Sequence, residues 1–149
     1  MIKRISILFL CLLIFSVRSV NAEDKFLSLK KNKVNVRYGP SFDSKIKYIY
    51  KKINLPVKQI DKKENFRRIV DLKNNSGWIH ISQLKKSNSI IILEDKILFK
   101  NSSNYSKPIA RLEKGRLLVV KKCENNWCSI TTDNYSGWIK ADNIWGSIE

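Results

Sequence analysis

Short apolar runs of strand length recur along the chain, separated by polar segments rich in turn residues. In the first half, apolar side chains alternate with polar neighbours, as in half-buried strands, at Val34, Val36, Val57, Ile60, Phe66, Ile69, Ile79 and Ile81. The segments between them, "YGPSFDS", "KKEN" and "KNNSG", contain the Gly, Pro, Asn and Asp that turns require. About five short strands per module, closed by a one-turn helix such as "ISQL" (81–84), predict a small all-β barrel.

The pattern occurs twice, because "SGWIH" at 76–80 returns as "SGWIK" at 136–140, with the second Gly-Trp 60 positions after the first. The preceding segments align in the same order: 65–80 with 126–140, 55–61 with 117–123, 44–50 with 106–112 and, more loosely, 35–43 with 97–105. Such self-similarity indicates a duplicated module. We therefore predict two tandem barrels, each with about five strands and a 3-10 turn, over residues 28–86 and 90–146.

The first copy also resembles a known domain family. "VNVRYGPSFDSKI" (34–46), "LPV" (55–57) and "GWIH" (77–80) are similar to the bacterial Src-homology-3-like domain, which usually opens with a V-N-V-R-x-G-P-S segment. The second copy, with "CENNWC" (123–128), "GWI" (137–139) and "IWG" (144–146), resembles the divergent partner in a family of secreted proteobacterial proteins that carry this domain twice. It has "LFKNSS" (98–103) in place of the arginine-glycine-proline segment. The resemblance covers about residues 28–146 and implies binding in the cell wall or periplasm more than catalysis.

Residues 1–22 have the composition of a signal peptide. Lys3 and Arg4 give a basic start, 5–17 is uncharged and apolar, and "SVNA" ends at Ala22 with small residues where a signal peptidase reads. The apolar run is short of the roughly 20 residues that a membrane span needs. We expect cleavage near Ala22 and a periplasmic or secreted mature chain without a transmembrane segment.

The mature chain is strongly basic, with 26 Lys and Arg against 13 Asp and Glu. Such a charge attracts nucleic acid, anionic lipid or lipopolysaccharide surfaces, or cell-wall carboxylates, and secretion argues against nucleic acid. Composition offers another explanation for the charge. The 22 Lys against 7 Arg, together with 20 Ile and 14 Asn, are typical of an AT-rich genome.

Candidate catalytic groups are sparse. His80 is the single histidine, and strand alternation places Ile79 and Ile81 on one face and His80 on the other, outward face. Nucleophilic catalysis needs a nucleophile, a base and an orienting group, and a zinc site needs four ligands near one another. The acidic residues are scattered and no phosphate-binding glycine loop is present. We therefore expect no enzymatic activity, no metal and no cofactor.

Cys123 and Cys128 lie at the two sides of a short predicted hairpin, "CENNWC". A tight turn can bring the two sulfur atoms across from each other, and an oxidising compartment favours their pairing. We predict a disulfide; two free buried thiols are the alternative. The repeat alignment sets Asp61 over Cys123 and Arg67 over Cys128, so we expect an ion pair in the first copy where the second has the disulfide.

Aromatic side chains suit shallow binding grooves because they offer rigid apolar area with a polar edge. The candidate groove residues of the first copy are Arg37, Tyr38, Phe42, Tyr48 and Trp78, and the second-copy aromatic residues are Tyr105, Tyr135 and Trp138. Phe66, Trp127 and Trp145 are expected in the core or at barrel ends, and packing between the modules is the alternative for Trp78. Gly39 and Pro40 predict a sharp turn in this loop. The turn either holds the aromatic side chains of the loop in place for a ligand or only shapes the chain.

Three functions fit these features. The leading hypothesis is a binding module for peptidoglycan stem peptides or a peptide segment of an envelope protein. The others are a cationic adhesion domain for an anionic envelope surface and an accessory subunit of a wall hydrolase. The two modules are expected to pack together, because "IIIL" (90–93) is too apolar for a free linker.

Overall fold

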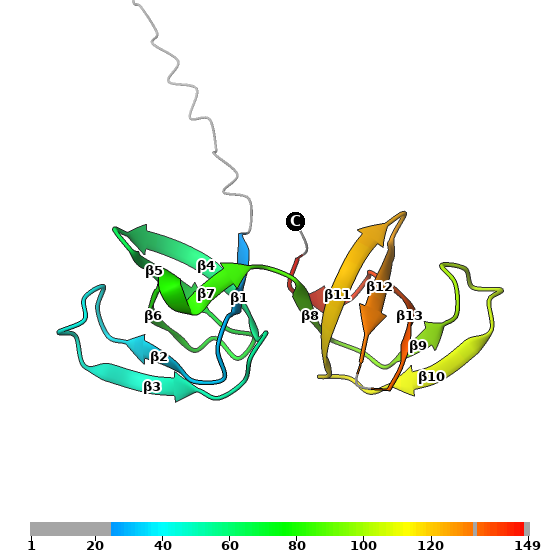
Figure 1. The fold of residues 1–149 in the computed structure, drawn as a ribbon, viewed down its shortest axis with the longest axis horizontal. Helices are drawn as coiled ribbons and strands as arrows, with labels where there is room; N and C mark the ends of the chain where they lie inside the picture. Colours follow the sequence, from blue (N-terminus) through cyan, green and yellow to red (C-terminus); the bar gives the residue numbers. More distant parts are fainter. Residues whose placement is uncertain (1–24, 133, 148–149) are drawn as a thin grey trace, which may run out of the picture.

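The computed structural model describes residues 25–132 and 134–147, so the predicted signal peptide lies outside the described residues (Figure 1). Two antiparallel sheets follow one another along the chain and lie side by side. The strand order is β3-β2-β6-β5-β4-β1-β7 in the first and β10-β9-β13-β12-β11-β8-β14 in the second. The orders match strand for strand. The prediction of two tandem all-β modules is confirmed.

Each sheet has seven strands. The first contains β1 (Phe26–Leu29), β2 (Val34–Arg37), β3 (Ile46–Tyr50), β4 (Pro56–Lys63), β5 (Phe66–Val70), β6 (Ser76–His80) and β7 (Leu84–Lys86), with the 3-10 turn η1 (Ile81–Gln83) before β7. The second contains β8 (Ser89–Ile92), β9 (Lys96–Phe99), β10 (Pro108–Leu112), β11 (Leu117–Glu124), β12 (Trp127–Thr131), β13 (Ser136–Lys140) and β14 (Ile144–Trp145). The described residues contain a 3-10 turn in the first module alone. The strands beyond the expected five are the first and last of each module, β1, β7, β8 and β14.

Each module closes around its own apolar core. The first core is formed by Leu29, Val34, Val36, Val57, Ile69, Ile79 and Leu84. The second is formed by Ile90, Ile92, Leu98, Leu112, Leu118, Val120, Cys128, Ile130 and Ile139. Most of these positions follow the period-two alternation of the sequence, because one face of each strand is buried. Ile60 and Ile81 were expected in this pattern, but they are 48% and 39% exposed; Ile81 lies in η1, where strand alternation no longer applies.

The repeated Gly-Trp marks a close crossing in each module. Trp78 on β6 lies opposite Arg37 on β2, and Trp138 on β13 lies opposite Phe99 on β9. A Cβ atom at Gly77 would lie within 3.0 Å of Val36 Cγ1, and one at Gly137 would lie 2.5 Å from the Phe99 carbonyl oxygen. Only glycine allows this approach. The motif is repeated because both barrels close in the same way.

The strand pairing shows that the repeat alignment is wrong by one residue along β4 and β11, the first strands of the β4–β5 and β11–β12 hairpins. In β4–β5, Lys62 lies opposite Arg67, while in β11–β12 Cys123 lies opposite Cys128. Cys123 therefore corresponds to Lys62 rather than to Asp61. The expected ion pair between Asp61 and Arg67 is wrong, since Arg67 donates instead to the carbonyl oxygens of Glu64 and Phe66, both at 2.9 Å. The shift along this hairpin arises in the β3–β4 loop, which is one residue longer in the first module, 51–55 against 113–116.

The predicted disulfide is present. It joins Cys123 and Cys128, whose Cα atoms are 4.1 Å apart across the β11–β12 hairpin. Cys128 is fully buried in the second core, so the disulfide joins the hairpin end to the packed interior. A closed loop this short contributes about 2 kcal/mol in the chain-entropy estimate.

The modules are joined by buried polar and aromatic contacts. The Ser28 and Ser89 hydroxyl oxygens are 2.7 Å apart, and the Ser89 hydroxyl donates to the Asn54 carbonyl oxygen. Because the Ser89 proton is engaged in this way, Ser28 is the donor to Ser89. The Trp145 indole Nε1 donates to the Pro56 carbonyl oxygen at 3.2 Å, and the Trp145 ring packs edge-on against Phe26 with centroids 5.1 Å apart.

The connection between the modules is short and buried. Only Ser87 and Asn88 separate β7 from β8, and Ser87 is 3% exposed. The "IIIL" segment starts inside β8, whose four residues are all buried in the second sheet. The chain therefore passes between the sheets without a free tether.

Gly77→Ala should lower the free energy of unfolding by about 1–3 kcal/mol, because the new methyl group overpacks the crossing against Val36. Gly39→Ala is the control, since its methyl group would meet the end of the Ser44 side chain, which can rotate away. Urea unfolding measures both. An equal decrease in the free energy of unfolding in the two variants would contradict the role of the β2–β6 crossing.

Trp145→Ala should uncouple the modules, because it removes the indole hydrogen bond and the ring contact with Phe26. We expect calorimetry to change from one unfolding transition to two. Trp138→Ala is the matched control, since Trp138 is half-buried and its ring faces Lys122 of the same module, 5.3 Å away. A single transition in the Trp145 variant, at the same temperature as the control variant, would contradict this account.

Candidate functional site

Part of the predicted groove forms one pocket on the first module. The pocket has a volume of about 260 Å³ and is lined by Arg37, Tyr38, Lys47, Arg68, Ser76, Gly77 and Trp78. Strands β2, β3, β5 and β6 contribute to it, together with the loop that follows β2. Of the five predicted residues, the structure brings Arg37, Tyr38 and Trp78 together. Lys47 and Arg68 join them, although neither has a sequence motif that would have marked it.

The loop after β2 is held in place by Arg37. Its Nη1 donates to the carbonyl oxygens of Phe42, at 3.0 Å, and Ser44, at 2.7 Å. The Tyr38 amide also donates to the Lys45 carbonyl oxygen at 3.1 Å, which closes the loop at its base. Gly39 has no positive φ, so it does not serve a left-handed turn; a Cβ there would meet only the end of the Ser44 side chain, 2.7 Å away, which can rotate.

The pocket combines cations with aromatic faces. Tyr38 is 67% exposed, and the Lys47 ammonium lies 5.7 Å from its ring centroid while donating to the Ser76 carbonyl oxygen at 2.9 Å. Trp78 is half-buried and lies opposite both Arg37 and Arg68 in the strand pairs. Trp78 therefore belongs to this pocket and not to the contact between the modules. Such a surface suits a ligand with a carboxylate and a flat or apolar part.

Phe42 and Tyr48 do not line this pocket. The Phe42 ring instead contacts the rings of Phe66 and His80, whose centroids are 5.3 and 4.8 Å from its own. Tyr48 is half-buried against the first core, and its hydroxyl lies 3.3 Å from that of Tyr50. Both positions follow from the fold, because the loop turns Phe42 toward β5 and β3 directs Tyr48 toward the core.

The Tyr48–Tyr50 pair is part of a hydrogen-bonded chain. The Tyr50 hydroxyl donates to the Asp71 carboxylate at 2.9 Å. Burial raises the pKa of Tyr50 well above its ordinary value, and the hydrogen bonds with Tyr48 and Asp71 raise it further. The same burial raises the pKa of Tyr48. Both hydroxyls therefore stay protonated at physiological pH and serve as structural donors.

His80 has a structural role at the start of η1. Its Nδ1 accepts a hydrogen bond from the Ser82 amide at 3.3 Å and lies 2.8 Å from the Ser82 hydroxyl. Through the amide bond, His80 caps the 3-10 turn.

The second module has a different surface at the equivalent place. Phe99 stands where Arg37 stands in the first module, so the guanidinium that holds the loop is missing there. Tyr105 is 99% exposed and Tyr135 is 47% exposed. A nearby cavity of about 250 Å³ is lined partly by acidic residues, and its buried Lys96 pairs with Glu94 at 3.0 Å and Asp142 at 2.9 Å. The hydrogen bond from Lys96 lowers the pKa of Asp142.

Across residues 25–132 and 134–147, the structure holds no group of three metal-ligating His, Cys, Asp or Glu side chains. No helix in the same residues is long and apolar enough to cross a membrane.

A family model for the bacterial SH3 domain matches residues 30–86 and, a second time, residues 97–146. The chain belongs to the bacterial SH3 domain family. The two matched segments correspond to the two sheets. The predicted resemblance to a tandem bacterial Src-homology-3-like protein is therefore confirmed. The pocket described above thus lies on the first bacterial SH3 domain, and the disulfide on the second.

Solved structures of two proteins from Trichomonas vaginalis are similar to this pair of SH3 domains. NlpC2 shares 13% identity over 84% of this chain, with a TM-score of 0.39, and NlpC1 shares 12% over 87%, also with a TM-score of 0.39. The match spans 49% and 48% of the length of those two chains. Comparison with curated protein sequences found no match.

Arg37→Gln should loosen the loop over residues 38–45, because the loop loses two charge-assisted hydrogen bonds to its carbonyl groups. Such bonds contribute about 1.5 kcal/mol or more, which corresponds to roughly tenfold faster amide hydrogen exchange in the loop. Arg68→Gln removes the same charge from the same pocket and should leave loop exchange unchanged. Equal exchange in the two variants would contradict the role of Arg37.

Proposed function

We propose that this protein is a non-catalytic binding module of the cell envelope, and that the first SH3 domain recognises a peptide of the cell wall or of an envelope protein. The observation that carries the proposal is the convergence of Arg37, Tyr38 and Trp78 on one solvent-open pocket. Family membership adds support, since bacterial SH3 domains are binding domains rather than catalysts.

The pocket chemistry favours a carboxylate-bearing peptide. Arg37, Lys47 and Arg68 supply positive charge, and Tyr38 and Trp78 supply rigid apolar area with few rotatable bonds. Stem peptides of peptidoglycan carry free carboxylates on a short backbone, and they fit both features. The hydrogen bonds of Arg37 to the loop reduce the ordering cost of binding, because the loop is held before a ligand arrives.

This function requires the protein to be outside the cytoplasm. The basic start and short apolar run of residues 1–22 support export and cleavage near Ala22, and the Cys123–Cys128 disulfide is consistent with an oxidising compartment. The periplasm or the extracellular space is thus the proposed location.

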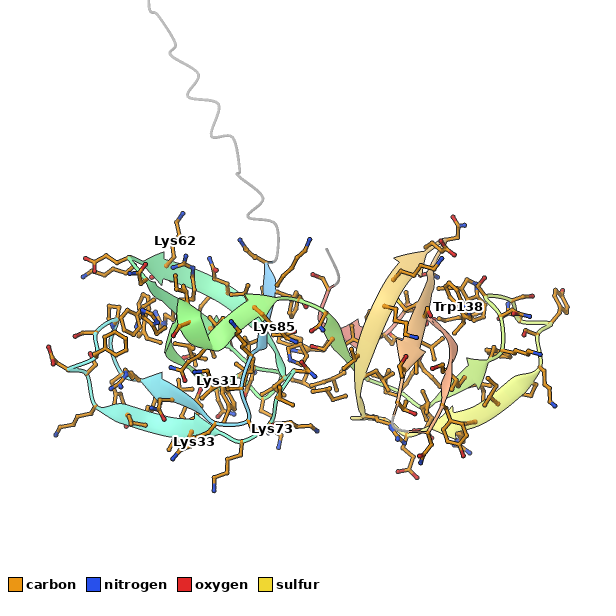
Figure 2. All side chains as sticks on the ribbon, viewed as in Figure 1. Lys31, Lys33, Lys62, Lys73, Lys85 and Trp138 are labelled. Carbon is orange, nitrogen blue, oxygen red and sulfur yellow. A yellow bond between two sulfur atoms is a disulfide. The ribbon has the colours of Figure 1, made fainter. Side chains whose placement is uncertain are left out.

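Adhesion to an anionic envelope surface is the second candidate, and the charge distribution favours it. Residues 25–86 contain 17 Lys and Arg against 4 Asp and Glu, whereas residues 87–147 contain 9 against 6. Lys96, Arg111 and Lys122 of the second module form ion pairs with acidic side chains of the same module. In Figure 2, Lys62 lies on the opposite side of the first module from Lys33 and Lys73, so lysines occupy at least two of its sides.

Binding to purified peptidoglycan sacculi at two salt concentrations tests the proposal. Tyr38→Ala or Trp78→Ala should weaken binding by about 2 kcal/mol, a loss of roughly thirtyfold, because each removes an aromatic anchor from the pocket. Binding by the unmodified protein should persist above physiological ionic strength, where attraction through surface lysines is screened.

Tyr135→Ala and Trp138→Ala are the matched controls, because they remove the same residue types from the second module. Circular dichroism establishes that each variant is folded. Equal losses in both modules, or binding that disappears at high salt in the unmodified protein, would contradict a pocket-based function and favour surface adhesion.

A further inference from the structure

A second recess lies between the two modules. It has a volume of about 630 Å³ and is lined by Asn32, Lys51, Lys52, Ile53 and Asn54 of the first module and by Arg116, Leu117, Val119, Thr131 and Thr132 of the second. The β3–β4 loop and the β10–β11 turn supply residues to its two sides, and Figure 1 shows these connections on the facing sides of the modules. None of its residues lines the first-module pocket.

Hydrogen bonds fix the two sides of this inter-module cleft relative to each other. The Asn54 amide donates to the Leu29 carbonyl oxygen at 2.9 Å, and the Asn54 carbonyl oxygen accepts from Ser89 of the second module. On the other side, the Arg116 carbonyl oxygen accepts from the Ile92 amide at 3.2 Å. Because Ser89 and Ile92 both belong to β8, one strand connects the two sides.

The cleft concentrates positive charge. Lys51, Lys52 and Arg116 are all exposed, and none of the three has a carboxylate partner among the described residues. The residues that line the cleft include no acid. Three like charges around one recess raise the local electrostatic potential, and a bound anion relieves their repulsion.

The cleft also has an apolar wall. Ile53 is 43% exposed, and Leu117 and Val119 are half-buried along β11. Thr131 and Thr132 add hydroxyl groups beside them. A ligand that fills this space would place an anionic group near the three cations and an apolar part against the wall.

We propose that the inter-module cleft is a binding site for a small organic anion that carries an apolar part, such as an aryl phosphate or an aromatic carboxylate. The site is separate from the first-module pocket and exists only in the tandem arrangement, because Lys51 and Lys52 come from one module and Arg116 from the other. Neither bacterial SH3 domain holds it alone.

Isothermal titration of the full mature chain with phenyl phosphate, phthalate and inorganic phosphate, at constant ionic strength, tests this site. Phenyl phosphate or phthalate should bind saturably with one site per chain, and the tighter of the two assigns the anionic group as phosphate or carboxylate. Inorganic phosphate should bind more weakly than phenyl phosphate, because it leaves Ile53, Leu117 and Val119 uncovered.

A triple variant, Lys51→Gln, Lys52→Gln and Arg116→Gln, should weaken this binding by about tenfold. The control triple variant, Lys62→Gln, Lys63→Gln and Lys107→Gln, removes the same charge from exposed positions outside the cleft and should change binding less than about twofold. Equal losses in the two variants, absence of saturable binding, or equal affinity for phenyl phosphate and inorganic phosphate would overturn the proposal. Sacculus binding by the cleft variant should be retained, which separates this site from the first-module pocket.

Discussion

The close crossing of β6 over β2 is the constraint on which the first module depends. Gly77 allows the two strands to approach at Val36, and the crossing brings Trp78 opposite Arg37. Arg37 in turn holds the loop that presents Tyr38. Barrel closure and pocket geometry therefore have the same origin, and a residue larger than glycine at this point would disturb both.

The two modules keep this crossing but differ in surface chemistry. Gly137 repeats the approach in the second module, yet Phe99 replaces Arg37, and a disulfide joins the hairpin where Lys62 and Arg67 face each other in the first. The second module also pairs its buried Lys96 with two carboxylates. The first module, by contrast, carries most of the net charge. Duplication has preserved the fold while the polar surface has divided into a cationic half and a nearly balanced half.

The fold could be predicted from the sequence because its signals are local: the alternation of apolar and polar residues, the turn residues and the repeated Gly-Trp motif. The site was only partly readable. Arg37, Tyr38 and Trp78 could be grouped by their motif, but Phe42 and Tyr48 pack elsewhere, since the direction of a loop side chain depends on packing partners distant in sequence. Lys47 and Arg68 reach the pocket through strand pairing that only the sheet register reveals, and a one-residue difference in loop length was enough to misplace the expected Asp61–Arg67 pair.

The central claim is that the first-module pocket, rather than net charge, recognises a wall peptide. Nuclear magnetic resonance titration of the labelled mature chain with soluble stem-peptide fragments measures this most directly. Saturable shifts are expected at the Trp78 indole and at the amides of Arg37 and Tyr38, with little change at Trp138. Shifts spread over the surface lysines of the first module, or equal shifts at Trp78 and Trp138, would contradict it.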